Sequence, residues 1–262
     1  MTDHAIRFDD GARYEQMMGK WSVPVGEQFL DWIAAPMGAR WLDVGCGNGA
    51  FTQLLVTRCA PMSVQAFDPS PEQLAYARTR MPAGAPVSWA EGDAMALPVA
   101  DASVDAAVMA LVLFFVPEPS RGVAEMVRAV RPGGIVAAYH WDILGGGFPW
   151  NDIGAELRNL GSNPSMPPSV EASTLEASAA LWQAAGLDQV ETRTFTVQRR
   201  FEDFEDYWES AKPSNTLAPL FADLGDEVLA QVKAKVRDKL CPNGGAFSVS
   251  ARSNAVRGVR PK

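Results

Sequence analysis

The chain has 262 residues, 47% of them hydrophobic, which is enough for one well-buried α/β domain with additional segments. The formal net charge of -8 predicts no basic face for nucleic-acid phosphates or anionic membranes, and the longest apolar run, residues 106–116, is too short to span a bilayer. Three widely spaced cysteines indicate reduced thiols in a cytoplasmic protein and predict no metal site.

Strand-like apolar runs alternate with amphipathic helical stretches, the pattern of a parallel sheet with helices on both faces. The pattern predicts strands at residues 40–44, 63–67, 86–90, 104–110, 135–141, 189–200 and 246–256. It predicts helices at residues 50–59, 71–81, 119–130 and 174–185. RPGG at 131–134 is expected to be a turn. The sequence therefore predicts a Rossmann-like, doubly wound, seven-stranded α/β fold.

Two segments interrupt this alternation. Residues at about 142–172 contain GGG and the proline-rich NPSMPPS, which indicate an irregular insert, and residues 201–244 have a mainly helical pattern. Inserts of this length are usually functional or disordered. We expect both to form a cap on a core that runs from residue 40 to residue 262.

The first predicted strand leads into a glycine-rich loop, within WLDVGCGNGAF at residues 41–51. Glycines at alternate positions permit backbone angles that a Cβ forbids, so a ligand can lie against bare backbone. The helix that begins near Ala50 presents unpaired N–H groups to the same place. The sequence predicts a nucleotide site formed by this loop, which consists of Gly45, Cys46, Gly47, Asn48 and Gly49.

Acidic residues follow the next two strands, at the sheet edge where open α/β folds bind ligands. Asp68 lies nineteen residues after Gly49, the spacing of a carboxylate that binds ribose hydroxyls. Asp93 is placed to accept a hydrogen bond from an adenine amine, and either aspartate could instead stabilise a turn. GCGNGA also fits a dinucleotide loop, which keeps a nicotinamide-dependent oxidoreductase as an alternative. Asp43 disfavours it, because its carboxylate would face a pyrophosphate.

Several segments in combination resemble the class I S-adenosylmethionine-dependent methyltransferases, of the small-molecule and ubiquinone/menaquinone-biosynthesis type. They are LDVGCGNG, FDPS, EGDAMALP, DAAVMALVLFFV and EMVRAVRPGGIVAAYHWD. The resemblance covers residues 40–257 and implies an antiparallel last strand in AFSVSARSNAVRG. It implies that S-adenosyl-L-methionine is the cofactor and S-adenosyl-L-homocysteine the product. The methyl group would pass to an oxygen, nitrogen or carbon atom of a small molecule by in-line displacement.

The resemblance also assigns cofactor contacts residue by residue. Those in the core are Asp43, Gly45, Cys46, Gly47, Asn48, Gly49, Asp68, Pro69, Asp93, Ala94, Ala110 and Leu111. Residues 1–39, which include YEQMMGKWS, are similar to the N-terminal cover of small-molecule members. Within this cover we expect Tyr14, Met18 and Trp21 to contact cofactor or substrate, although simple packing would also explain them.

Two predictions concern the acceptor side. His140 lies at the carboxyl end of the fifth strand and is a candidate general base, or else a structural histidine bonded to backbone. Several similar proteins have a histidine where this chain has two phenylalanines after the fourth strand. Aromatic residues predict a pocket for an apolar or aromatic acceptor, although they would also seal a cap: Phe114, Phe115, Trp141, Trp150 and Trp208. A noncatalytic protein that binds S-adenosylmethionine remains a further alternative.

Overall fold

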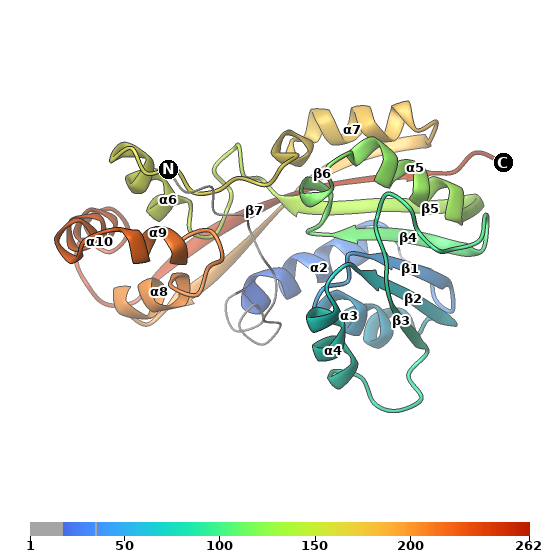
Figure 1. The fold of residues 1–262 in the computed structure, drawn as a ribbon, viewed down its shortest axis with the longest axis horizontal. Helices are drawn as coiled ribbons and strands as arrows, with labels where there is room; N and C mark the ends of the chain where they lie inside the picture. Colours follow the sequence, from blue (N-terminus) through green and yellow to red (C-terminus); the bar gives the residue numbers. More distant parts are fainter. Residues whose placement is uncertain (1–17, 35) are drawn as a thin grey trace.

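The computed structural model describes residues 18–34 and 36–262, which form a seven-stranded sheet with helices on both faces (Figure 1). The strand order is β3-β2-β1-β4-β5-β7-β6. Only β7 runs antiparallel to its neighbours, β5 and β6. This arrangement confirms the predicted fold class. The strands are β1 (Arg40–Val44), β2 (Ser63–Asp68), β3 (Val87–Glu91), β4 (Val104–Ala110), β5 (Val130–Trp141), β6 (Asp188–Phe201) and β7 (Phe247–Val259).

Helices cover the two faces of the sheet and bury separate apolar clusters. One face carries α2 (Lys20–Trp32), α3 (Ala50–Cys59) and α4 (Pro71–Thr79), and the other carries α5 (Pro119–Ala129) and α7 (Leu175–Ala184). Three of these helices, α3, α4 and α5, begin at the residue that the sequence predicts. Ser70 caps α4 by accepting a hydrogen bond from the Gln73 N–H at 3.2 Å, and a proline follows it in the first turn.

The expected turn at 131–134 is wrong, because these residues belong to β5. The strand already pairs with β4 at Val130, and its register then shifts before Ile135 resumes the pairing. Gly133 has a φ of 75° within this irregular stretch, and its N–H donates to the Arg260 carbonyl at 2.8 Å. A glycine therefore accommodates a strand irregularity here.

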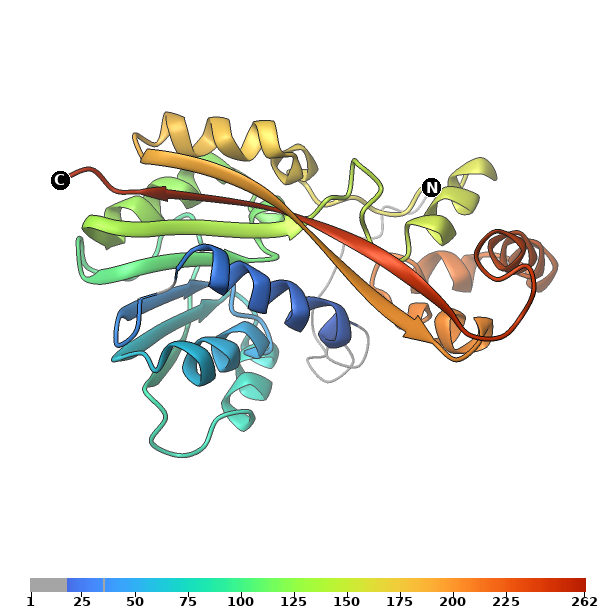
Figure 2. The ribbon, with the colours of Figure 1, turned by 180° about the vertical axis from the view of Figure 1, so that it is seen from behind.

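Strands β6 and β7 extend beyond the end of the neighbouring strand, β5. Pairing between β5 and β7 reaches Trp141 opposite Ser253, whereas pairing between β6 and β7 continues to Phe201 opposite Phe247. Beyond β5 the two strands form a twisted ribbon that leads away from the sheet to a separate group of helices (Figures 1 and 2). The ribbon connects the core to the second insert.

Both inserts meet at the end of this ribbon. The second insert contains α8 (Phe204–Ala211), α9 (Ala218–Asp223) and α10 (Asp226–Leu240), and α6 (Asn151–Asn159) of the first insert packs against α10. Lys239 pairs with Asp152 at 2.6 Å between these two helices. We call these four helices with the ribbon, residues 196–201 and 247–252, the lobe. Rings of Phe201, Phe204, Tyr207 and Trp208 lie in its buried interior.

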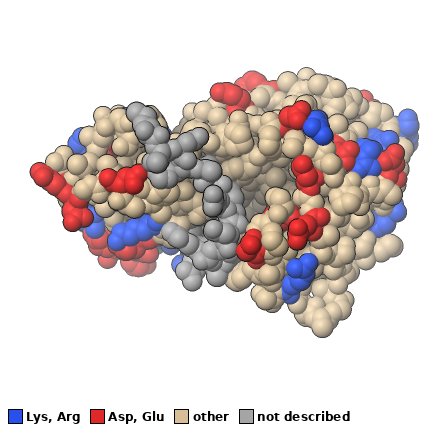
Figure 3. All heavy atoms as spheres, viewed as in Figure 1, with Lys and Arg blue, Asp and Glu red and all other residues tan. Residues whose placement is uncertain are grey.

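The surface agrees with the acidic composition. On the face shown in Figure 3, lysine and arginine side chains are scattered among acidic ones, and a hollow is visible in the surface of the core. Within residues 18–34 and 36–262, no helix combines the length and apolar character needed to cross a membrane.

Candidate active site

The glycine loop between β1 and α3 forms the floor of the site. Gly45, Gly47 and Gly49 all have positive φ, at 73°, 51° and 79°. The N–H groups of Gly45 and Cys46 both donate to the Phe67 carbonyl, at 2.7 and 2.9 Å, so the loop is fixed to the end of β2. A Cβ on Gly45 would lie 2.5 Å from a methyl carbon of Val112, whereas one on Gly47 would meet nothing within 4 Å. The loop therefore packs tightly against Val112 at Gly45, whereas the space beside Gly47 is open.

Asp68 holds this loop from the end of β2. Its Oδ2 accepts a hydrogen bond from the Gly47 N–H at 2.8 Å, and its Oδ1 accepts one from the Ser70 N–H at 2.9 Å. Burial raises the pKa of Asp68, and the two backbone hydrogen bonds oppose this shift. Because a carboxylate oxygen has two lone pairs, each oxygen keeps one acceptor position. Asp68 can thus accept from two vicinal hydroxyls while it still holds the loop.

A first cavity of about 600 Å³ lies above the loop and the carboxyl ends of β2 and β4. Eight of the predicted cofactor residues line it: Gly45, Cys46, Gly47, Asn48, Asp68, Pro69, Ala110 and Leu111. Sequence reasoning missed further lining residues, among them Ser22, Val23, Phe51, Gln73, Val112 and Tyr139. The cavity combines bare backbone, one carboxylate and apolar side chains, so its residues fit an adenosyl cofactor.

Asp43 lies behind the loop, not in the first cavity. It is fully buried, and its Oδ2 accepts a hydrogen bond from the Thr52 hydroxyl at 2.5 Å. Burial raises the pKa of Asp43 to about 7, and the hydrogen bond from Thr52 opposes the shift. Its Oδ1 has no hydrogen-bond partner among the described residues. The predicted contact between Asp43 and the methionine part of the cofactor stays a prediction.

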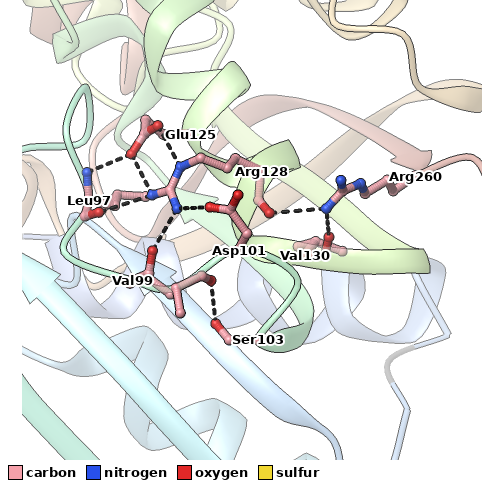
Figure 4. A network of polar contacts seen from close by, with 9 residues as sticks. Leu97, Val99, Asp101, Ser103, Glu125, Arg128, Val130 and Arg260 are labelled. Atoms are coloured by element: carbon pink, nitrogen blue, oxygen red, sulfur yellow. Dashed lines mark hydrogen bonds and ion pairs between the residues drawn. The ribbon is translucent and has the colours of Figure 1, made fainter.

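Asp93 and Ala94 belong to the loop after β3 and are not among the described residues that line the first cavity. Asp93 is exposed, and its Oδ1 accepts a hydrogen bond from the Met95 N–H at 2.8 Å, as in the alternative turn role. Arg128 fixes the following stretch by donating to the carbonyls of Leu97 and Val99 at 3.0 and 2.6 Å (Figure 4). The adenine contacts of Asp93 and Ala94 stay predictions.

A second cavity of about 530 Å³ opens between the core and the lobe. It adjoins the first cavity, because four residues line both: Leu111, Phe115, Ser165 and Met166. We call these four residues the junction. The second cavity is lined mainly by apolar side chains and includes four of the predicted pocket residues: Phe114, Phe115, Trp141 and Trp150.

Of the remaining aromatic and N-terminal candidates, some line a cavity and others pack in the interior. Met18 lines the second cavity, not the first. Trp21 is fully buried with its ring 6.2 Å from that of Phe201, and Trp208 stacks on Phe221 at 5.3 Å inside the lobe. Neither tryptophan is among the described residues that line the two cavities. Tyr14 lies outside the described residues.

Residues 162–169 pass over both cavities and supply a wall that sequence reasoning did not identify. Ser165 and Met166 belong to the junction, and Pro168 lines the first cavity. The N–H and hydroxyl of Ser169 donate to the carbonyls of Phe114 and Val116, at 3.0 and 2.8 Å. We call residues 162–169 the strap. Its proline-rich composition indicated an insert but gave no sign of which residues it would meet.

His140 occupies the strand end as predicted, but it is not among the described residues that line either cavity. Successive strand residues point to opposite faces, and its neighbours Tyr139 and Trp141 pack on the α2 and α3 side. His140 is fully buried, and its ring lies 6.4 Å from that of Phe114. Burial lowers its pKa to about 3, and Asp142 partly opposes this shift. The structure therefore does not support the predicted general base.

Known proteins resemble the part of the chain that forms the first cavity. Residues 42–138 match the methyltransferase domain family. The malonyl-[acyl-carrier protein] O-methyltransferase of Pectobacterium atrosepticum is 38% identical over 112 residues, which cover 43% of this chain and 42% of that protein. The ubiquinone/menaquinone biosynthesis C-methyltransferase UbiE of Roseobacter denitrificans is 32% identical over 111 residues, covering 41% of this chain and 44% of that protein. The matches thus span less than half the length of these relatives.

A solved structure extends the likeness to the whole fold. The phosphoethanolamine N-methyltransferase 2 of Haemonchus contortus, in complex with S-adenosyl-L-methionine, has a TM-score of 0.60 at 16% identity. The alignment covers 96% of this chain and 57% of that one. At this identity the likeness shows a shared fold. Residues 42–138 thus resemble the methyltransferase domain family, and the first cavity, which these residues help to form, fits an adenosyl cofactor.

Proposed function

We propose that this protein transfers the methyl group of S-adenosylmethionine to a small molecule bound in the second cavity. The observation that carries the proposal is the junction, where the cofactor cavity and a separate apolar cavity share four lining residues. An in-line displacement needs the acceptor atom and the leaving group on opposite sides of the methyl carbon. Two adjoining cavities provide one place for each.

The second cavity favours an apolar or aromatic acceptor. Rings of Phe114, Phe148 and Trp150 line it, and Phe148 and Trp150 pack edge to face at 5.5 Å. Such rings provide a large contact area for a flat apolar molecule. The match with the methyltransferase domain family ends at residue 138, before the strap and the lobe. The acceptors named for the relatives therefore say little about this pocket.

Alignment is the main catalytic contribution that the described residues can make. When bound, the cofactor supplies a methyl group on a sulfonium, which is a good leaving group. Asp68 and the glycine loop would fix its ribose and methionine parts, and the junction would hold the acceptor against it. Holding two reactants in such a geometry is worth roughly 7 to 11 kcal/mol of the barrier. The described junction residues include no carboxylate and no imidazole, so the proposal includes no side-chain base.

Isotope transfer tests the proposal directly. The purified protein is incubated with a metabolite extract and S-adenosylmethionine that carries a deuterated methyl group, and mass spectrometry follows deuterium into small molecules. We expect a labelled product with the wild type and with Glu72→Gln, a control that neutralises an exposed neighbouring acid outside the cavity. Asp68→Ala should form little product.

The alternatives give different results in the same preparation. Affinity for S-adenosylhomocysteine without a labelled product would favour a noncatalytic binding protein. Affinity for a nicotinamide cofactor, together with none for S-adenosylhomocysteine, would favour an oxidoreductase and contradict the proposal.

A further inference from the structure

A single cation, on an exposed side chain, lines the second cavity. Of the described residues that line it, Arg158 on α6 is the only one with a charged side chain. Its guanidinium donates a long hydrogen bond of 3.4 Å to the Asn151 Oδ1 and forms no ion pair within the described part of the chain. By contrast, Lys235 and Lys239 of the same lobe both pair with carboxylates of α6. The guanidinium of Arg158 is thus available to a ligand.

The sequence of α6 directs this cation toward the cavity. Trp150, Gly154 and Arg158 are spaced at four-residue intervals, so they follow one face of the helix, and all three line the cavity. A Cβ on Gly154 would lie 3.3 Å from the Arg158 Nη1, so the guanidinium lies directly over the glycine. The missing side chain leaves room for the arginine and for a ligand beside it.

A second donor lies on the same helix face. Trp150 is 1% exposed, and its indole N–H has no hydrogen-bond partner among the described residues. A buried donor without a partner costs stability, so such groups in native proteins usually meet a ligand or water. The indole nitrogen is itself buried, so the ring of Trp150 lines the cavity while the inference rests on Arg158.

We infer that the methyl acceptor carries a carboxylate, and that Arg158 is the specificity-determining residue that binds it. The inference rests on the proposed function of the second cavity. Arg158 is not part of the junction, so the carboxylate would lie away from the atom that receives the methyl group. A guanidinium matches a carboxylate with two parallel hydrogen bonds. One cation fits this single charge better than a phosphate, whose second charge would find no partner.

Charge makes this contact selective. A protein with a net charge of -8 repels anions in general, so an anionic acceptor needs a local cation to enter an apolar cavity. A purely structural role is the alternative, because Arg158 lies in the last turn of α6, where a cation stabilises the helix dipole. That role would not distinguish a charged ligand from a neutral one of the same shape.

Calorimetry with two probes tests the inference. The protein is first saturated with S-adenosylhomocysteine and then titrated with a hydroxynaphthoate or with the corresponding uncharged hydroxynaphthamide. We expect the wild type to bind the naphthoate at least about tenfold more tightly. Arg158→Gln should bind the two probes equally and keep its affinity for the amide. Lys235→Gln is the matched control, because it removes a lobe cation that does not line the cavity, and it should keep the preference.

Three outcomes would overturn the inference: equal binding of the two probes to the wild type, binding of neither, or a preference that survives in Arg158→Gln. The first titration separates this failure from that of the proposed function. S-adenosylhomocysteine binding tests the cofactor cavity by itself, and a deuterium-labelled product without any naphthoate preference would leave the methyl transfer intact.

Discussion

Replacement of Asp68 is the most direct test of the cofactor cavity, because this carboxylate serves the ligand and the loop at once. Its two oxygens accept from the N–H groups of Gly47 and Ser70 and retain one acceptor position each. Two ribose hydroxyls would fill these positions. A hydrogen bond to a charged group contributes about 1.5 kcal/mol at the lower end of its range. Two such bonds amount to about 3 kcal/mol.

Asp68→Ala should therefore weaken the binding of S-adenosylhomocysteine at least about 100-fold, measured by calorimetry. Asp68→Asn should lose a similar amount, since its amide NH₂ would face one of the two backbone donors that the carboxylate now accepts. Glu72→Gln, which removes an exposed acid of the same segment, should bind as the wild type does. An affinity within threefold of wild type in a folded Asp68→Ala protein would refute the ribose role.

Three further predictions concern the loop, the buried histidine and the second cavity. Gly45→Ala should lower the free energy of unfolding in urea by at least about 2 kcal/mol, because the new Cβ would clash with Val112 and the residue would keep an unfavourable φ. Gly47→Ala should lower it by about 1 kcal/mol, because there only the φ is unfavourable. Equal losses in the two variants would contradict this account. His140 stays neutral in the fold while the unfolded chain gains a proton below pH 6.5, so stability should fall by up to about 1.4 kcal/mol per pH unit from pH 6.5 toward 3. His140→Leu should show a shallower acid slope in urea titrations, and an unchanged slope would exclude this origin. Phe148→Ala should weaken hydroxynaphthoate binding about tenfold in calorimetry and leave S-adenosylhomocysteine binding unchanged. The reason is that Phe148 lines the second cavity and not the first. Weaker binding of both ligands would argue against separate cavities.

Local signals in the sequence were sufficient to predict many of the residues that line the cofactor cavity. Strands β1 and β4 and helix α3 begin and end where the apolar patterns predict, because buried parallel strands have continuous apolar runs. Parallel strands bring their carboxyl ends to one edge, which placed the glycine loop beside Asp68. His140 shows the limit of this reasoning. The strand end was right, but the alternation along β5 directs its side chain to the opposite face.

The second cavity could not be predicted in the same way, because its walls come from segments that are distant in the sequence. Ser169 of the strap donates hydrogen bonds to the carbonyls of Phe114 and Val116, which are far away in the sequence, and no periodicity predicts such contacts. Arg158 was likewise unremarkable in sequence, since only the folded position of α6 shows that it lines a cavity without an acidic partner. Trp208 was predicted for the pocket, yet the packing of the lobe interior buries it against Phe221.

The β6–β7 ribbon has a consequence for how this architecture can change over time. Residues 201 and 247, between which the second insert leaves and rejoins the ribbon, are paired directly across it, so the ends of the insert are fixed one strand spacing apart. A segment attached in this way can be lengthened, shortened or exchanged without altering the path of the chain through the sheet. Residues 42–138, which contain the glycine loop, lie entirely outside it. The ribbon thus allows the second insert, which contributes residues 214–217 to the second cavity, to vary while the glycine loop stays unchanged, and chimaeras that exchange residues 202–246 between relatives would measure how much this insert contributes to ligand binding there.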